Sequence, residues 1–198
     1  TGVKRIFFSS SSEVYGEPVE FPQNEDTTPL NSKLPNAIVK NVAEAFLKSY
    51  KKEYDLDYTI FRFFNTYGPR QTTDFVMSRF VNLALKNEDI TIYGDGKQTR
   101  TFCYIDDNIE TTCSAFLKDK YINDVLNVGN DNEVSILDLA KEIIKVTGSR
   151  SRILNGPPLK EGDMTRRKPD ISKMKILLNR DLVSLKEGIR KVAELGKF

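Results

Sequence analysis

The sequence predicts an α/β protein in which short strands alternate with amphipathic helices. Two segments rich in strand-forming apolar residues, 3–8 and 57–64, are each followed by a polar break, as expected for buried strands. Between them, residues 37–54 place apolar side chains at spacings of three and four, the pattern of an amphipathic helix. Strand-forming and helix-forming segments keep alternating along the rest of the chain, and this alternation favours α/β architecture.

The first half of the chain can be assigned in order. The strand at 3–8 runs into four serines at 9–12, which indicate a polar loop, and the proline-rich residues 17–35 are expected to wrap over the surface. The helix at 37–54 has a charged outer face. Its apolar positions, which are expected to pack inward, are Ile38, Val42, Ala45, Phe46 and Tyr50.

The second half contains shorter elements. Ser135 suits the N-cap of a helix and Gly148 suits its end. One or two further helices are expected within 171–198. The remaining predicted strands are 90–93, 100–105 and 125–128, and the remaining predicted helices are 75–86, 106–117 and 135–146.

Composition narrows the possible functions. The chain has 198 residues, 39% hydrophobic and 29% charged, as in ordinary globular proteins. Its net charge of +2 comes from 30 basic and 28 acidic residues that are interspersed, so neither nucleic acid nor a membrane surface is an expected partner. No apolar run approaches the ~20 residues that cross a bilayer, and no signal peptide is evident, so a cytoplasmic location is expected.

Histidine is absent and cysteine is rare. Without histidine, His-containing metal sites and Ser-His or Cys-His nucleophiles are excluded, and no metal site is predicted. Cys103 and Cys113 cannot form a disulfide framework, and Cys103 is expected to be a buried free thiol. General acid–base chemistry must therefore use Tyr, Lys, Glu or Asp.

Chemistry-bearing residues occur in segments of fixed order. A serine loop is followed by a helix-borne Lys40, an asparagine turn, a glycine-containing turn and an arginine pair. The segments are Ser-Ser-Glu-Val-Tyr-Gly at 11–16, Arg-Phe-Phe-Asn-Thr-Tyr-Gly-Pro-Arg at 62–70, Tyr-Gly-Asp-Gly-Lys-Gln-Thr-Arg at 93–100 and Arg-Arg-Lys-Pro-Asp at 166–170. In this order they resemble the NAD-dependent epimerase/dehydratase branch of the short-chain dehydrogenases/reductases, and most closely its UDP-glucuronate decarboxylases, from residue 3 to about residue 178.

The resemblance implies a fold, a cofactor and partners. It implies a partial Rossmann-like parallel sheet whose N-terminal half is absent, with a small α/β nucleotide-sugar-binding region. Residues 1–68 would be the remnant of the NAD-binding Rossmann domain. Residues 69–198 would mainly bind the nucleotide sugar, interleaved with returning Rossmann elements. NAD is the implied cofactor and a UDP-sugar the implied substrate, with a homodimer formed through the helix at 37–54 or a complementing N-terminal segment as the protein partner.

The resemblance also implies catalytic roles. In the family, NAD oxidises the sugar at C4, and a tyrosine takes the hydroxyl proton with help from a lysine, here Lys40. The catalytic set implied by the motifs is completed by Ser11, Ser12, Glu13 and Arg167. Ser12-Glu13 in place of Asp-Glu favours decarboxylation, with a dTDP-glucose 4,6-dehydratase or a sugar epimerase as the alternative.

A further set of residues is expected to bind substrate. Asn65 stands where the family holds the nucleotide diphosphate, although asparagine also suits a turn after a strand. Arginines are suited to phosphates and carboxylates, but some of them can be simple surface charges. Tyr93 can line the uracil pocket or fill the core. The full expected set is Ser11, Ser12, Asn65, Arg79, Tyr93, Gln98, Arg100 and Arg167.

Departures from the family pattern bear on activity. Its Tyr-x-x-x-Lys pair, which also contacts the cofactor, aligns on Asn36 and Lys40, and an amide cannot serve as a general base. Loss of such a base typically costs ~10²–10⁴-fold in rate. The glycine-rich turn that binds the NAD pyrophosphate is missing from the 198 residues. We therefore expect little turnover, an unpaired edge on the first strand that associates with a partner, and, as an alternative, a non-catalytic nucleotide-sugar-binding or interaction module.

Overall fold

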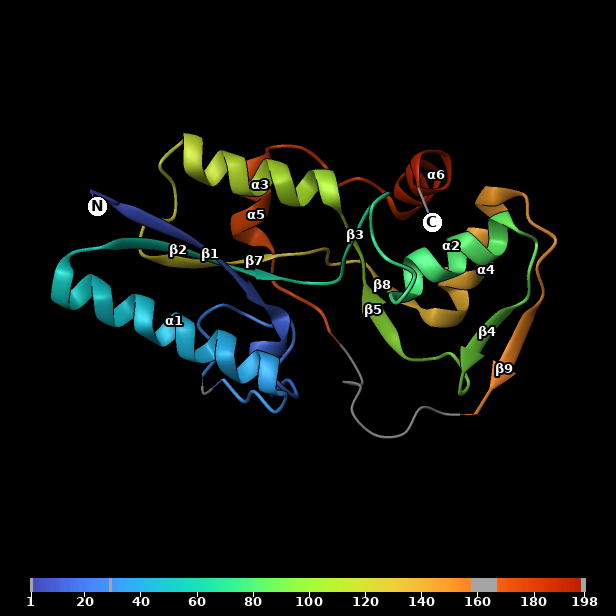
Figure 1. Cartoon of the computed structure of the whole chain (residues 1–198), viewed down its shortest axis with the longest axis horizontal. Helices are drawn as coiled ribbons and strands as arrows, with labels where there is room; N and C mark the ends of the chain where they lie inside the picture. Colours follow the sequence, from blue (N-terminus) through green and yellow to red (C-terminus); the bar gives the residue numbers. More distant parts are fainter. Residues whose placement is uncertain (1, 29, 158–166, 197–198) are drawn as a thin grey trace.

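A computed structural model describes residues 2–28, 30–157 and 167–196, and it confirms the α/β class. Its central sheet is parallel, with β1 (Arg5–Ser11), β2 (Asp57–Phe63) and β7 (Asp124–Val128) in the order β1-β2-β7 (Figure 1). The register places Ser9 beside Phe61 and Phe61 beside Leu126. Because the strands are parallel, their carboxyl ends meet at one edge.

Helices cover both faces of this sheet. Helix α1 (Pro35–Tyr54) lies on one face, and α3 (Ile105–Leu117) and α5 (Ser172–Leu178) lie on the other (Figure 1). Successive strand side chains alternate between the faces. Accordingly, Ile60 belongs to the buried cluster on the α1 side and Phe61 to the cluster beneath α5. This arrangement is Rossmann-like, as the resemblance implied.

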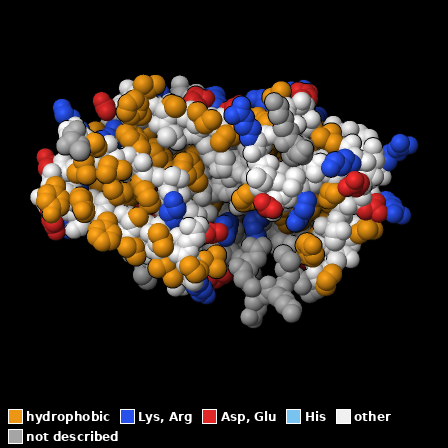
Figure 2. Space-filling model, viewed as in Figure 1, with side chains coloured by type: hydrophobic (Ala, Val, Ile, Leu, Met, Phe, Trp, Pro, Cys, Tyr) orange, Lys and Arg blue, Asp and Glu red, His pale blue; other side chains and the backbone are white. Residues whose placement is uncertain are grey.

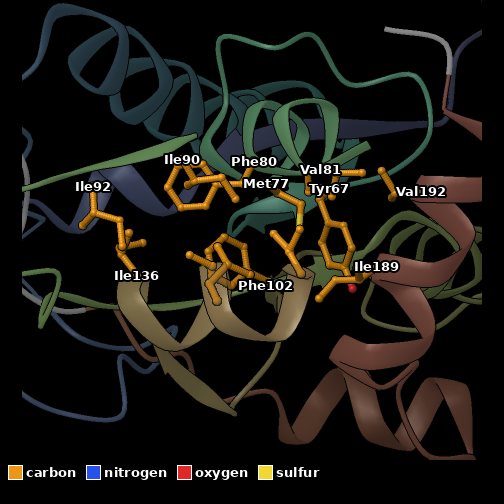
Figure 3. Packing of buried hydrophobic residues seen from close by; sticks show 14 of the residues in the cluster. Tyr67, Met77, Phe80, Val81, Ile90, Ile92, Phe102, Ile136, Ile189 and Val192 are labelled. Carbon is orange, nitrogen blue, oxygen red and sulfur yellow. The ribbon is translucent and has the colours of Figure 1, made fainter. Parts of the chain in front are cut away.

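A second lobe packs beside the carboxyl edge of the sheet. It contains α2 (Val76–Leu85), α4 (Ile136–Thr147) and α6 (Leu185–Leu195), whose buried side chains form the core in Figure 3. Two small ladders flank the helices, and a third, β3 with β6, joins the lobes. The paired strands are β4 (Ile90–Tyr93) with β9 (Ile153–Gly156), β5 (Thr99–Thr101) with β8 (Glu133–Ser135), and β3 (Thr66–Tyr67) with β6 (Cys103–Tyr104).

Helix ends follow local signals in the sequence. The Ser135 side chain accepts a hydrogen bond from the amide of Asp138, and Gly148 ends α4 in the left-handed conformation with φ 64°, as predicted. Pro35 occupies the first turn of α1, where its missing N–H costs no helical hydrogen bond. The predicted boundary between domains at residue 68 stays a prediction, since α3, β7 and α5 return to the sheet after it.

Some expected elements were wrong in detail. The first strand does not stop before the serines but continues to Ser11, and a short 3-10 helix, η1 (Ser12–Tyr15), follows it. Strands β3, β8 and β9 were not predicted. They span only two to four residues, too few for a pattern of alternating hydrophobicity.

The expected orientation of α1 was also wrong. Its apolar residues point to solvent: Ile38 is 46% exposed and Phe46 is 60% exposed. Figure 2 shows hydrophobic side chains gathered over the half of the molecule that contains α1. The side facing the sheet instead carries buried Ala37 and Glu44, because Arg62 of β2 points into this face and a buried guanidinium needs a carboxylate partner.

Candidate active site

A cavity of about 320 Å³ opens where the carboxyl edge of the sheet meets the second lobe. Strand β1 brings the serine loop to this edge, and β2 brings the asparagine turn. The start of α2 and the segment before α5 close the other sides. The lining residues are Ser11, Ser12, Glu13, Phe63, Phe64, Asn65, Thr66, Tyr67, Gln71, Phe75, Val76, Met77, Phe102 and Arg167.

The serine loop is fixed by its own hydrogen bonds. The Ser11 hydroxyl accepts a bond from the Glu13 amide at 3.2 Å and so caps η1, while Ser12 is buried. The loop ends at Gly16, where φ is 62° and a Cβ atom would lie 1.7 Å from the carbonyl oxygen of Asn31. Only glycine fits there, and the loop is thereby tied to the irregular segment that wraps over it.

Arg167 reaches the serine loop from the opposite end of the chain. Its Nη2 atom lies 3.8 Å from Oε1 of Glu13, and its Nη1 atom donates to the Ser12 hydroxyl at 3.4 Å. Both charged side chains are mostly removed from water, with 12% of Arg167 and 27% of Glu13 exposed. The cavity therefore holds a cation and a carboxylate side by side. Arg166, which precedes Arg167 in the motif, lies outside the described residues.

Asn65 is held at the end of β2. Its side-chain Nδ2 atom donates to the Thr101 carbonyl at 3.0 Å. Its backbone carbonyl accepts a hydrogen bond from the Cys103 N–H at 3.1 Å. These bonds fix the amide side chain at the wall of the cavity. Cys103 behind it is a buried free thiol, as expected, and burial raises its pKa.

Lys40 and Asn36 lie on the first turns of α1 and are not among the lining residues. Residues four apart share a helix face, so the spacing of the family pair is preserved. Lys40 donates from Nζ to the Ser9 carbonyl at 2.6 Å, which holds its amine at the end of β1. Asn36 is exposed.

Four of the predicted binding residues lie outside this cavity. The Arg79 guanidinium is 5.9 Å from the ring centre of Tyr93, and Gln98 donates to the Tyr93 carbonyl at 3.4 Å, so these residues group together in the second lobe. Arg100 is 7% exposed and donates to the Thr99 carbonyl at 2.7 Å. The structure thus brings together Ser11, Ser12, Glu13, Asn65 and Arg167 and places Arg79, Tyr93, Gln98 and Arg100 elsewhere, outside the lining of this cavity.

Sequence reasoning missed the aromatic walls of the cavity. Phe63 ends β2, Phe64 follows it, and Tyr67 lies in β3. Phe75 and Phe102 line the cavity from the second lobe. Aromatic residues in strands are more often core than site, so composition alone did not separate them. Their sequence position next to Asn65 was the available signal.

A buried polar network behind the serine loop was also missed. Arg62 pairs with Glu44 through bonds of 3.2 Å from Nε and 2.8 Å from Nη2, and Ser10 donates to the same carboxylate at 2.5 Å. Arg62 also donates to the Tyr15 hydroxyl, which donates in turn to Asn127. Burial raises the pKa of Tyr15 to about 12. A lone arginine within the apolar run of residues 60–64 was the signal that could have found this network.

The residues present fit only one end of a bound NAD. Lys40 places a cation near the end of β1, at the position that the resemblance implies for the lysine of the Tyr-x-x-x-Lys pair. The pyrophosphate end needs backbone amides from a glycine-rich turn, and the 198 residues contain no such turn.

Together, the doubly covered parallel sheet and the polar cavity at its carboxyl edge define a Rossmann-like protein whose candidate site lies at the edge where such sheets usually bind ligands. The sequence profile of the NAD dependent epimerase/dehydratase family matches residues 1–129. The chain belongs to this family.

Curated relatives are nucleotide-sugar enzymes. The chain is 37% identical over 197 residues to UDP-glucuronic acid decarboxylase 1 of Danio rerio, an alignment that covers 96% of this chain and 46% of the relative. It is 35% identical over 207 residues to the UDP-N-acetyl-alpha-D-glucosaminuronate decarboxylase of Bacillus cytotoxicus, covering 98% of this chain and 64% of the relative. The chain therefore spans about half to two thirds of the length of these proteins.

Solved structures of nucleotide-sugar epimerases superpose on this chain. The UDP-glucose 4-epimerase of Thermotoga maritima with UDP-glucose superposes with a TM-score of 0.90 at 34% identity, covering 98% of this chain and 63% of that one. The UDP-glucuronic acid 4-epimerase of Bacillus cereus, in complex with UDP-glucuronic acid and NAD, gives a TM-score of 0.85 at 33% identity, covering 96% and 60%. Across the described part of this chain, no helix has the length and apolar character that a membrane crossing requires.

Proposed function

We propose that this chain forms the sugar-nucleotide half of a UDP-glucuronate decarboxylase-like enzyme and binds a UDP-sugar in the cavity at the carboxyl edge of the sheet. The observation that carries the proposal is the convergence of Ser11–Glu13, Asn65 and Arg167 on one cavity, although they come from three distant parts of the sequence. Relatives whose names include UDP-glucuronic acid decarboxylase support the choice of substrate class.

The Arg167 guanidinium in the cavity favours an acidic sugar. Arg167 can form charge-assisted hydrogen bonds with a sugar carboxylate, and guanidinium suits the planar, two-oxygen geometry of that group. Asn65, fixed by its bonds to neighbouring strands, can donate or accept toward the diphosphate. Glu13 and the serine hydroxyls then face the sugar ring.

The chemistry of the whole reaction needs more than these residues. When NAD is bound, it supplies the hydride acceptor for oxidation at sugar C4, after which the keto sugar can lose carbon dioxide. The hydroxyl proton needs a base, and the amide of Asn36 cannot take it. This chain therefore binds and orients the sugar nucleotide, and we expect at most a trace of turnover from it.

A non-catalytic binding role is the second candidate, and Asn36 is the observation that favours it. Relatives are named both as decarboxylases and as epimerases, so an epimerase-like activity is an alternative for the same cavity. In each case the Arg167 guanidinium is the group that favours an acidic sugar over a neutral one.

Titration calorimetry with UDP and UDP-glucuronate tests the proposal. Asn65→Ala and Arg167→Ala are each expected to weaken UDP-glucuronate binding by about 10-fold or more, the range for a lost hydrogen bond to a charged group. Thr59→Val, at the far end of β2, is the control for lost stability, since Thr59 is buried and bonds to Arg5 well away from the cavity. Wild-type protein that binds neither ligand would contradict the proposal.

A second experiment separates enzyme lineage from binding module. Asn36→Tyr is combined with the N-terminal part of a relative, supplied in trans with NAD. Carbon dioxide released from UDP-glucuronate by this combination, and not by the unmodified chain, supports a decarboxylase. Tight binding without any release in either form supports the binding module.

Protein partners follow from the exposed surfaces. The apolar stripe of α1, with Phe46 and Tyr50 among its exposed residues, supports a homodimer formed through this helix. Among the described residues, the outer edge of β1 pairs with no other strand. This edge and the exposed apolar side chains of α3, such as Phe116, support a complementing N-terminal segment. The cytoplasmic location stays a prediction.

A further inference from the structure

We propose that Gln23 is a positioning residue that holds Arg167 in the cavity, and that the affinity for an acidic sugar therefore depends on Gln23 although it is not among the lining residues of the cavity. This inference rests on the proposed function, because it concerns how the carboxylate-binding arginine is held. Gln23 lies in the irregular segment between η1 and α1, far from Arg167 in the sequence.

Gln23 pairs with the stretch that follows Arg167. The backbone N–H of Gln23 donates to the Lys168 carbonyl at 2.7 Å, and the backbone carbonyl of Gln23 accepts the Asp170 N–H at 2.8 Å. These two bonds form a parallel bridge between Gln23 and Pro169. The side-chain Oε1 of Gln23 accepts the Lys168 amide at 3.2 Å. The peptide units immediately after Arg167 are thus fixed by the backbone and the side chain of a single residue.

Gln23 is itself hydrogen-bonded to the central sheet. Gln23 is 1% exposed, and its carbonyl also accepts a hydrogen bond from the Asn127 side chain at 2.9 Å. Asn127 belongs to β7, and its backbone N–H donates to the Glu25 carboxylate at 2.8 Å. Arg62 of β2 donates to the Glu25 carbonyl at 3.1 Å. Movement of Gln23 would therefore break its bond to β7 and would disturb the neighbouring Glu25, which is bonded to β7 and to β2.

Residues 168–170, which Gln23 holds, are closely packed. A Cβ atom on Gly129, at the end of β7, would lie 3.1 Å from Pro169 and 2.9 Å from the Cβ atom of Phe64. The stretch after Arg167 is therefore packed against the same strand ends that frame the cavity. Arg167 in turn meets Ser12 at 3.4 Å and Glu13 at 3.8 Å, distances at which a small displacement would end the contact.

The side chain of Gln23 can be altered without altering its backbone bonds. Gln23→Met keeps the length of the side chain but removes the strong acceptor for the Lys168 amide, and Gln23→Glu restores an acceptor oxygen. The Nε2 atom of Gln23 has no hydrogen-bond partner within the described ranges, so glutamate gives up no bond on that side. At this buried position the glutamate is expected to be protonated and neutral, so it adds no buried charge. Gln23→Asn is the milder alternative if the methionine variant does not fold.

The measurement is the ratio of affinities for UDP-glucuronate and UDP-xylose, which carries the same nucleotide and ring without the carboxylate. Gln23→Met is expected to lower this ratio by about three- to tenfold, the effect of one hydrogen bond, with UDP affinity kept within about twofold. Gln23→Glu is expected to recover it. In the Arg167→Ala background, Gln23→Met is expected to change the ratio no further, because Gln23 acts through Arg167.

Each possible result either supports or overturns the inference that Gln23 holds Arg167. An unchanged ratio in Gln23→Met, or in Gln23→Asn if the methionine variant does not fold, would overturn the inference while leaving the proposed function in place. An equal loss of affinity for all three ligands, matched by the Thr59→Val control, would show that Gln23 contributes only to stability and would also overturn it. If the wild-type chain binds none of the ligands, the proposed function fails and the inference fails with it.

Discussion

Replacing Glu44 with alanine is expected to destabilise the fold by about 3–5 kcal/mol, the range for breaking a buried ion pair by removing one partner. Glu44 is 1% exposed and Arg62 is 2% exposed, so no water replaces the lost carboxylate without rearrangement. The substitution removes two bonds from Arg62 and one from Ser10. The bonds of Arg62 to Tyr15 and to the Glu25 carbonyl remain, but neither partner neutralises the charge.

Urea unfolding followed by circular dichroism measures this effect. For a chain of this size the loss corresponds to a fall in melting temperature of roughly 6–20 °C. Glu53→Ala is the matched control, since it makes the same substitution on an exposed position of the same helix and is expected to stay within about 0.5 kcal/mol of wild type. A double variant, Glu44→Leu with Arg62→Met, is expected to recover most of the loss because no unpaired charge remains.

A loss below about 1 kcal/mol in Glu44→Ala would refute this reasoning. It would mean that the guanidinium reaches water and that the pair resembles a surface salt bridge. A double variant as unstable as Glu44→Ala would refute it differently, by showing that packing and not charge sets the cost.

Three further outcomes are expected. Gly188→Ala should destabilise by about 1–3 kcal/mol in urea unfolding, because its Cβ atom would lie 1.9 Å from the hydroxyl of Tyr67; wild-type stability would contradict the packing. Hydrogen bonds, chiefly from Ser172, lower the pKa of Asp170 below 3.8, so its stabilisation is present above about pH 4 and lost as the pH falls through the folded value. The difference in free energy of unfolding between wild type and Asp170→Asn should therefore decrease from pH 7 to pH 3. A difference that stays constant over this range would contradict the stabilising role of the Asp170 carboxylate. Dithiobis(nitrobenzoate) should label one thiol per folded chain, the exposed Cys113, and rapid labelling of both would show that the core opens.

Much of the site followed from the order of motifs along the sequence. Ser11–Glu13 follow β1 and Asn65 follows β2, and parallel strands bring their carboxyl ends to one edge, so these residues had to lie near each other. Arg167 was expected with them from the family pattern alone. Nothing in its neighbourhood in the sequence indicated which element would hold it there.

Other features could not be predicted because they depend on contacts between distant segments. Arg100 occurs in a motif with Tyr93 and Gln98, yet it is buried beside Thr99 and does not line the cavity. The apolar positions of α1 gave a correct helix but the wrong face. Periodicity reports that one side is apolar, and it does not report whether that side meets the sheet or a partner.

The sequence by itself determined the longer strands, the principal helices and the ends of α4, because these depend on neighbours within a few residues, such as Ser135 and Gly148. It also predicted that Asn36 occupies the position of the tyrosine in the Tyr-x-x-x-Lys pattern. Only the tertiary structure decided which face of α1 covers the sheet, since that choice was made by the buried charge of Arg62. It likewise decided that Gln23 holds the stretch after Arg167, because hydrogen bonds between segments so far apart exist only once the chain has folded.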